Sequence, residues 1–304
     1  MDFAGKIAVI TGGGTGMGRE LARALTGAGC SVAMCDVSEP NMAETARLCR
    51  DAAPQGTMVS TYRADVAIEA EMNGWADAVR AEFDTDKIHL LFNNAGIGGG
   101  GSFVAGDRAA WERTFEICFY GVIHGVRAFL PLLRNASEGR IVNTSSINGF
   151  WATLGPGRPH TAYSAAKFAV KGFTEALIED LALNAPHIGC SVVMPGHIGT
   201  EIAGNSMRIQ GAVEGELNFG GADAAALTAD ELIEQANAAF RDTAPMTAAE
   251  AAKVILDGVR AGKWRILVGK DAEFLDQCVR ADPEAAYTPQ FTEKLKAAGH
   301  LGVL

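Results

Sequence analysis

Short apolar runs alternate with longer amphipathic stretches along most of the chain. The runs are rich in β-branched residues, as expected of strands that are buried on both faces. Between them, apolar residues recur at the three- and four-residue spacing of helices. The predicted strands are 6–11, 31–36, 57–62, 88–93, 140–145, 189–194 and 264–268. This repetition predicts a doubly wound α/β fold, in which helices cover both faces of a mostly parallel seven-stranded sheet.

The chain shows no composition change that would separate two domains. No low-complexity or proline-rich linker interrupts the alternation, so residues 1–268 are predicted to form a single domain. Thr247 and Glu250 have the spacing of a capping box at the start of a helix near 247–262. Residues 269–304 follow the last predicted strand and form a C-terminal extension with several large apolar side chains.

Composition narrows the possible partners. The net charge is -10, which argues against nucleic acid or an anionic membrane surface as a partner. No stretch has the length and apolar character expected of a membrane span or a leader segment. The six cysteines form no C-x-x-C pair, so reduced thiols, a cytoplasmic location and no metal site are expected.

A glycine-rich turn follows the first predicted strand. Five of the seven residues from Gly12 to Gly18 are glycine, and a helical pattern starting near Met17 follows. The strict G-x-G-x-x-G fingerprint is absent, and the spacing is T-G-x-x-x-G-x-G instead. A glycine turn at a helix N-terminus lets a pyrophosphate approach backbone N–H groups, which predicts a dinucleotide site. A glycine-rich turn without a ligand is the alternative.

The second predicted strand ends in an acid, Asp36. A carboxylate at this position can accept both hydroxyls of an adenine ribose and repels a 2′-phosphate. Val37 follows it instead of an arginine, and the glycine turn contains the uncharged Thr15 instead of a cationic residue. NAD is therefore predicted in preference to NADP, although a solvated acid or a helix cap would also explain Asp36.

Tyr163 and Lys167 lie one helical turn apart in an alanine-rich helical segment. Residues at i and i+4 share a helix face, so the two side chains can converge on one ligand. A nearby ammonium stabilises a phenolate and is expected to lower the pKa of the phenol toward the working range of a base. The hydroxyl of Ser146, at the end of a predicted strand, can hold a substrate oxygen. Ser145 points to the opposite face of that strand and is the less suitable choice.

These motifs together resemble the short-chain dehydrogenase/reductase family. The matching elements are the T-G-x-x-x-G-x-G turn, Asn93-Asn94-Ala95-Gly96, the Tyr163–Lys167 pair with Ser146, and Pro195-Gly196. The resemblance implies a Rossmann fold, with Tyr163 as general acid/base. Lys167 would bind the nicotinamide ribose, and Ser146 would orient the substrate oxygen. The residues it implies for cofactor binding are Gly12, Thr15, Gly16, Met17, Asp36, Asp65, Val66, Asn93, Ala95, Gly96, Tyr163, Lys167, Pro195, Gly196, Ile198 and Thr200.

The remaining site residues are expected from their place in the chain. Trp151, His160 and His197 are candidate substrate contacts, and residues 201–246 correspond to the lid that covers the substrate in the family. Cys118 stands where the family normally has an asparagine associated with a water relay to the lysine. The extension could cover the pocket or a subunit contact.

The sequence therefore predicts an NAD-dependent enzyme that interconverts a secondary alcohol and a ketone, with oxidation as the expected direction. A non-catalytic NAD-binding scaffold and an epimerase or dehydratase on the same fold are the alternatives. The apolar stripe along the predicted helix 107–134 is longer than one contact requires. It indicates a homodimer or homotetramer.

Overall fold

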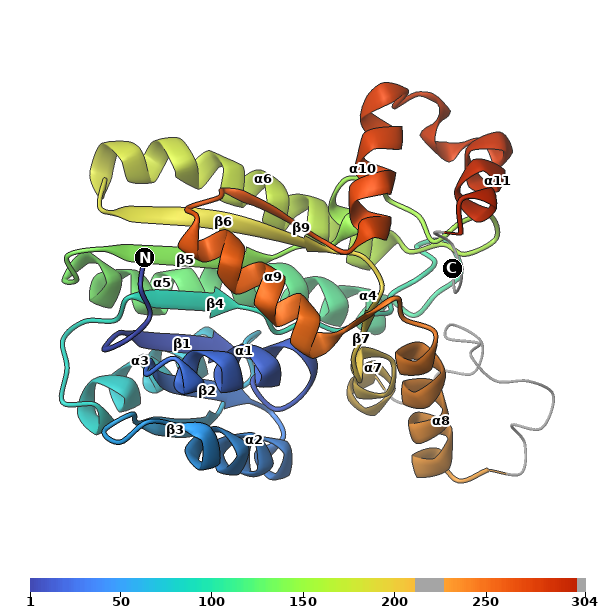
Figure 1. Cartoon of the computed structure of the whole chain (residues 1–304). Helices are drawn as coiled ribbons and strands as arrows, with labels where there is room; N and C mark the ends of the chain where they lie inside the picture. Colours follow the sequence, from blue (N-terminus) through green and yellow to red (C-terminus); the bar gives the residue numbers. More distant parts are fainter. Residues whose placement is uncertain (211–226, 300–304) are drawn as a thin grey trace.

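The computed structural model describes residues 1–210 and 227–299. Its centre is the parallel seven-stranded sheet that the sequence predicts, and the strand order is β3-β2-β1-β4-β5-β6-β9 (Figure 1). Each strand of this sheet begins and ends within two residues of its predicted ends. The strands are β1 (Ile7–Thr11), β2 (Ser31–Asp36), β3 (Val59–Arg63), β4 (Leu90–Asn93), β5 (Gly139–Thr144), β6 (Ile188–Pro195) and β9 (Arg265–Val268).

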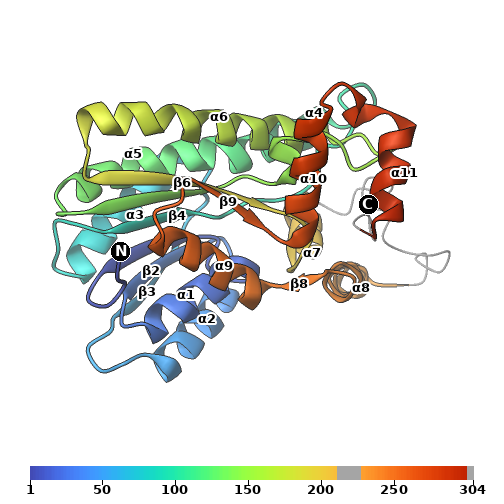
Figure 2. The same ribbon diagram turned by 45° about the horizontal axis from the view of Figure 1, so that its top comes forward.

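Helices cover both faces of the sheet because each strand has apolar side chains on both sides. One buried cluster joins the sheet to the helices α1, α2 and α9, and the other joins it to α3, α5 and α6. The two layers lie on either side of the strands in Figure 2. The helices are α1 (Gly16–Gly27), α2 (Glu39–Ala52), α3 (Glu69–Glu82), α4 (Arg108–Phe115), α5 (Gly121–Arg134), α6 (Thr161–Asn184) and α9 (Ala248–Arg260).

The long helix predicted near 107–134 contains a π-helical turn. α4 and α5 are joined by the turn Glu116–Tyr120, which has Cys118 at its centre. By length and composition the whole helix, Arg108–Arg134, is apolar enough to cross a membrane, which the sequence reading missed. However, 61% of its apolar window is buried inside the protein, as in the core helix of a folded domain.

Two further groups of elements lie beyond the carboxyl ends of the strands (Figure 1). The predicted lid, residues 201–246, contains α7 (Ile202–Gln210) and α8 (Ala229–Asp242), and its stretch 211–226 lies outside the described residues. The short strands β7 (Ile198–Gly199) and β8 (Met246–Thr247) pair with each other at the two ends of this segment. The extension forms α10 (Lys270–Ala281) and α11 (Pro289–Ala297). A separate buried cluster joins these two helices to Ile147 and Trp151, which follow β5.

Candidate active site

Two adjoining cavities open at the carboxyl ends of the strands, where ligands bind in open α/β sheets. The first, here called the glycine-loop cleft, runs from the turn after β1 past the ends of β2, β3 and β4. The second, here called the tyrosine pocket, lies between Tyr163 and the turn after β6. Met17, Thr200 and Ile202 line both, so one elongated ligand can extend from the cleft into the pocket.

The glycine loop is packed so closely that side chains are excluded from it. Gly12 has a φ of +67°, a left-handed conformation that favours glycine. A Cβ at Gly18 would lie 2.0 Å from the carbonyl oxygen of Gly12. The first turn of α1 therefore sits directly on the loop, with its N-terminus facing the cleft. Such a terminus offers free N–H groups to an anionic ligand.

Asp36 lies in the cleft and supports the loop. Its two carboxylate oxygens accept hydrogen bonds from the backbone N–H groups of Gly14 and Ser38, each at 3.0 Å. These bonds fix the carboxylate at the end of β2, facing the cleft, where the sequence places it. Each oxygen keeps a further lone pair for a ligand hydroxyl.

Asp65 and Val66 also line the cleft, beyond β3. The Asp65 carboxylate forms an ion pair with Arg113 from α4 and accepts a hydrogen bond from the N–H of Ala67. Arg113 lines the cleft as well, so a guanidinium faces the same space. Arg113 has no signature in the sequence, because it belongs to none of the motifs described above.

Asn93, which the sequence analysis placed in the cofactor site, is not among the residues that line either cavity. Its side chain is buried within the sheet, where Nδ2 donates to Oδ1 of Asn143 on β5 at 2.8 Å. Asn94 lines the cleft instead, and its Nδ2 donates to the carbonyl oxygen of Thr11 at 3.1 Å. Asn93 therefore joins two strands, and Ala95 and Gly96 leave room beside it.

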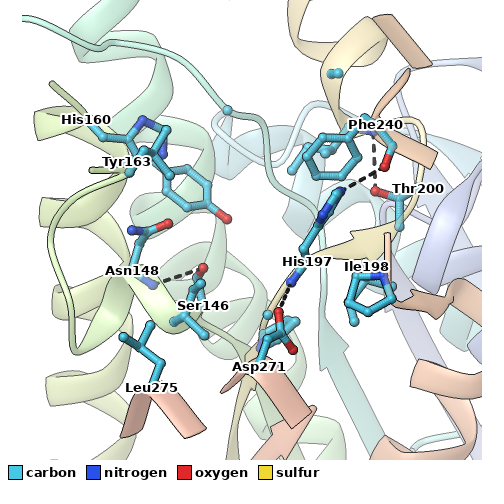
Figure 3. A pocket seen from close by; sticks show the side chains of 18 of the residues that line it. Ser146, Asn148, His160, Tyr163, His197, Ile198, Thr200, Phe240, Asp271 and Leu275 are labelled. Atoms are coloured by element: carbon cyan, nitrogen blue, oxygen red, sulfur yellow. Dashed lines mark hydrogen bonds between the residues drawn. The ribbon is translucent and has the colours of Figure 1, made fainter. Parts of the chain in front are cut away.

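Ser146 and Tyr163 face each other across one side of the tyrosine pocket (Figure 3). The Ser146 hydroxyl accepts a hydrogen bond from the N–H of Asn148 at 3.1 Å, which holds the oxygen in place. Ser145 points away from the pocket and donates to the carbonyl oxygen of Lys167 at 2.7 Å. Adjacent residues thus face opposite directions, as the strand geometry predicts.

Lys167 lies behind Tyr163, on the next turn of α6. Its ammonium donates to the carbonyl oxygen of Thr144 at 2.9 Å and lies 5.4 Å from the centre of the Tyr163 ring. A Cβ at Gly96 would come within 3.3 Å of Lys167 Nζ and 3.6 Å of Cys118 Sγ. The ammonium, the thiol and the end of the cleft therefore meet at Gly96.

Burial dominates the proton affinities of this group. It raises the pKa of Tyr163, and the hydrogen bond with the Ser146 hydroxyl lowers it by a smaller amount. Burial also lowers the pKa of Lys167. The sequence predicts that Lys167 lowers the pKa of Tyr163, but the net effect of the surroundings is to raise it, so this prediction is wrong. Tyr163 therefore keeps its proton at neutral pH.

Cys118 occupies the position at which the family normally has an asparagine. Its thiol is fully buried and donates a hydrogen bond to the carbonyl oxygen of Ile97 at 3.2 Å. It lies in the π-helical turn, where backbone carbonyl groups depart from the regular α-helical ladder. Cys118 thus supplies a weak hydrogen-bond donor at this position, and that donor is bound to a backbone carbonyl group.

The turn after β6 forms the opposite wall of the pocket, with Pro195, Gly196, Ile198 and Thr200 all lining it. The His197 ring packs on Phe240 of α8 with ring centres 4.3 Å apart. Its Nε2 lies 2.8 Å from the carbonyl oxygen of Phe240, so this nitrogen carries the proton. Burial lowers the pKa of His197, and the bond to Phe240 opposes that shift.

The other two candidate substrate contacts differ from each other. The His160 ring lies 4.7 Å from the Tyr163 ring, and burial lowers its pKa to about 4, so it is neutral. Trp151 belongs to the pocket wall, but its side chain is fully buried. Its Nε1 donates to the carbonyl oxygen of Ala286 at 2.7 Å. Trp151 therefore holds the extension in place more than it offers a surface to a ligand.

Several lining residues have no signature in the sequence. Leu275 and Leu295 come from the extension, and Phe240 comes from the predicted lid. Asn205 of α7 donates through Nδ2 to the Thr15 hydroxyl at 3.0 Å and so closes the lid over the glycine loop. Only the apolar residues of the extension gave a signal, and it did not indicate which surface they cover.

The comparisons with known proteins identify the family of this chain. The family model described as short chain dehydrogenase matches residues 6–210. A putative oxidoreductase, SadH, from Mycobacterium tuberculosis is 38% identical over 280 residues, covering 91% of each chain. The chain belongs to the short-chain dehydrogenase/reductase family and is an oxidoreductase of that family.

Solved structures extend the likeness to the whole fold. A short-chain dehydrogenase/reductase from Burkholderia phymatum in complex with NAD is 31% identical, with a TM-score of 0.76, over 95% of this chain and 98% of that one. A metagenomic short-chain oxidoreductase in complex with NADP is 26% identical, with a TM-score of 0.57, over 64% of this chain and 84% of that one. The family therefore includes binders of either nicotinamide cofactor.

Proposed function

We propose that this protein is an NAD-dependent oxidoreductase that interconverts a secondary alcohol and a ketone. The observation that carries the proposal is the position of Ser146 and Tyr163 where the glycine-loop cleft opens into the tyrosine pocket, with Lys167 behind them. A dinucleotide in the cleft and a substrate in the pocket would meet in front of the tyrosine.

The residues of the cleft suit a dinucleotide. The N-terminus of α1 and the closely packed glycines suit a pyrophosphate, and Asp36 suits the hydroxyls of a ribose. Gly12, Thr15, Gly16, Met17, Ala95 and Gly96 would form the bed of the ligand, and Pro195, Gly196, Ile198 and Thr200 would meet the nicotinamide. When bound, the cofactor supplies the acceptance or donation of a hydride.

The protein residues would handle the proton. In ketone reduction the Tyr163 phenol donates its proton to the substrate oxygen, which the Ser146 hydroxyl holds and stabilises. In alcohol oxidation the deprotonated Tyr163 takes that proton back. The Lys167 ammonium, fixed by the carbonyl oxygen of Thr144, stabilises the charge on the phenolate.

The preference for NAD rests on Asp36. Its charge would oppose a 2′-phosphate on an adenine ribose bound in the cleft. Both of its oxygens are fixed by backbone N–H groups. The structural relative from Burkholderia phymatum contains NAD, which supports the same choice. An NAD preference in turn favours oxidation of the alcohol.

The pocket favours an apolar substrate of moderate size. Its volume is about 270 Å³, near the lower end of the range for small-molecule sites. Apolar side chains form most of its wall: Ile147, Leu154, Phe240, Leu275 and Leu295. The His160 ring beside Tyr163 is neutral at physiological pH, because burial lowers its pKa to about 4. Uncharged secondary alcohols with alkyl or aryl substituents fit this lining.

We also propose that the protein acts as a homodimer or homotetramer in the cytoplasm. Aromatic side chains form a row on α4 and the adjoining turn, from Trp111 through Phe115 to Tyr120, with successive ring contacts of 5.7 and 6.1 Å. Tyr120 is 47% exposed, so part of this row faces outward. All six cysteines are free, which suits a reducing compartment. Sedimentation analysis tests the assembly.

A screen of secondary alcohols with NAD and NADP, followed through absorbance of the reduced cofactor, tests the activity. Oxidation of uncharged apolar alcohols with NAD is the expected result. The Tyr163→Phe variant distinguishes an enzyme from a binding scaffold, because it should bind NADH and fail to turn over. Unchanged turnover in that variant would reject the mechanism.

A further inference from the structure

Asp271 is a buried acid at the floor of the tyrosine pocket that no motif identifies. It belongs to the first turn of α10, in the extension, beyond the residues 6–210 that the family model matches. Its side chain lies between Leu275 and His197 in Figure 3. Its Oδ2 accepts a hydrogen bond from the backbone N–H of His197 at 2.7 Å. An acid from the end of the chain thus holds the turn that follows β6.

Two glycines beside the Asp271 carboxylate leave the space that it occupies. A Cβ at Gly196 would lie 2.1 Å from Asp271 Oδ2, and a Cβ at Gly269 would lie 2.2 Å from its Oδ1. Both glycines therefore leave space that the carboxylate fills. Oδ1 is buried and has no hydrogen-bond partner among the described residues, so the acid is kept there at a cost in desolvation. Because this desolvation lowers the stability of the fold, a role of Asp271 other than stabilisation is expected.

The same turn is held from its other side by the predicted lid. While the backbone of His197 is bound to Asp271, its ring nitrogen Nε2 donates to the carbonyl oxygen of Phe240 on α8. The extension is itself anchored to the segment after β5 by Trp151, through the bond to Ala286. The position of the turn Pro195–Thr200 is thus tied to two elements outside the sheet.

We propose that Asp271 is a positioning residue for the nicotinamide end of the cofactor, acting through the backbone of His197. This inference rests on the proposed function, since it assumes that the turn Pro195–Thr200 meets the nicotinamide. Without the carboxylate, the His197 N–H loses its partner in a buried position and the turn is free to shift. A shift of the turn weakens cofactor binding and misplaces the nicotinamide relative to the substrate.

Titration of the purified protein with NADH, followed by its fluorescence, tests the proposal without any substrate. Asp271→Ala is expected to weaken NADH binding by about tenfold, the usual effect of losing a hydrogen bond to a charged group. Asp271→Asn keeps an oxygen that can accept from His197 and is expected to stay within about threefold of the wild type. The control is Glu273→Ala, which removes an exposed acid from the same helix turn and should leave binding unchanged.

A double-mutant cycle with Gly196→Ala makes the test specific. In the wild-type background the added methyl group meets the Asp271 carboxylate and is expected to weaken NADH binding. In the Asp271→Ala background those carboxylate atoms are gone, so the same substitution should cost much less. Additive effects in this cycle would contradict the proposed contact.

The outcomes separate this inference from the proposed function. If the wild type binds neither NADH nor NADPH, both fail together. If the wild type binds NADH and folded Asp271→Ala binds it equally well, the positioning role fails and the proposed function stands. A lower melting temperature of Asp271→Ala with unchanged NADH affinity would likewise reduce Asp271 to a structural residue.

Discussion

The glycine-loop cleft and the tyrosine pocket share a boundary at Met17 and Thr200, yet they are assembled from different parts of the chain. The cleft is formed mainly by turns that follow β1 to β4, with α7 along one side, and its shape depends on backbone geometry and small residues. The pocket takes one wall from α6 and the segment after β5, the opposite wall from the turn after β6, and the rest from α8, α10 and α11. The cleft is therefore suited to a ligand that a whole family shares. In the pocket, elements outside the sheet determine which substrate fits.

Removing the hydroxyl group of Tyr163 should change the kinetics more than any other substitution below, and it should affect the tyrosine pocket alone. Tyr163→Phe is expected to lower kcat by about 1,000-fold, because general acid–base catalysis is lost. The affinity for NADH should change little, since the cleft is unaltered. Steady-state kinetics and fluorescence titration measure the two quantities. A variant that loses both together would indicate that cleft and pocket are not separable.

The rate of alcohol oxidation should rise with pH. Burial raises the pKa of Tyr163, so the deprotonated form is the minor one at neutral pH. Its fraction, and with it the oxidation rate, should increase about tenfold per pH unit below that pKa. Ketone reduction uses the protonated phenol and should stay level over the same range, falling only above the pKa. Rates of oxidation and of reduction, each measured from pH 6 to 9, test whether only the oxidation rate rises with pH.

Asp36→Asn should change the choice of cofactor and leave the choice of substrate alone. The amide keeps the shape and one acceptor oxygen but loses the charge that opposes a 2′-phosphate. The ratio of kcat/KM for NAD to that for NADP is expected to fall by about tenfold. The ranking of alcohols should remain. Asp51→Asn, on an exposed part of α2, is the matched control.

Trp151→Phe should loosen the pocket wall and spare the cleft. The variant keeps an aromatic ring but removes the buried hydrogen bond to the carbonyl oxygen of Ala286. The free energy of unfolding is expected to fall by about 1 kcal/mol, and KM for the alcohol to rise by less than the kinetic effect at Tyr163. Chemical denaturation measures the first change. Trp264→Phe, at a tryptophan that is 45% exposed, should not produce it.

The smallest effect is expected at Cys118. The thiol donates a hydrogen bond to the carbonyl oxygen of Ile97 and to no other group among the described residues. Cys118→Ala should therefore leave the pH profile of oxidation in place and change kcat by less than about threefold. Cys118→Asn restores the residue usual in the family. If neither variant alters the rate or its pH profile, this position has no part in proton transfer.

Most of the cleft could be predicted because its determinants are local. Gly12, Gly18 and Asp36 follow predicted strands, and backbone geometry explains why those residue types stand there. The adjacent residues Asn93 and Asn94 share one motif, and only the structure distinguishes them: Asn93 bonds to Asn143 within the sheet, while Asn94 faces the cleft.

The pocket resisted prediction for the opposite reason. Leu275 and Asp271 reach the site through packing of helices that are distant in sequence, and no spacing rule relates them to Tyr163. The upward shift in the pKa of Tyr163 also depends on burial, which a helical repeat does not reveal. The sequence could identify the pair Tyr163 and Lys167 but not the environment around it.

The extension has a consequence for how the molecule is made. A ribosome completes all seven strands before α10 and α11 emerge, so the sheet and the glycine loop are available to fold first. α10 and α11, which supply part of the pocket wall, are synthesised after the strands of that scaffold. Substitutions in these last helices can therefore change what enters the pocket while the order in which the sheet assembles stays the same.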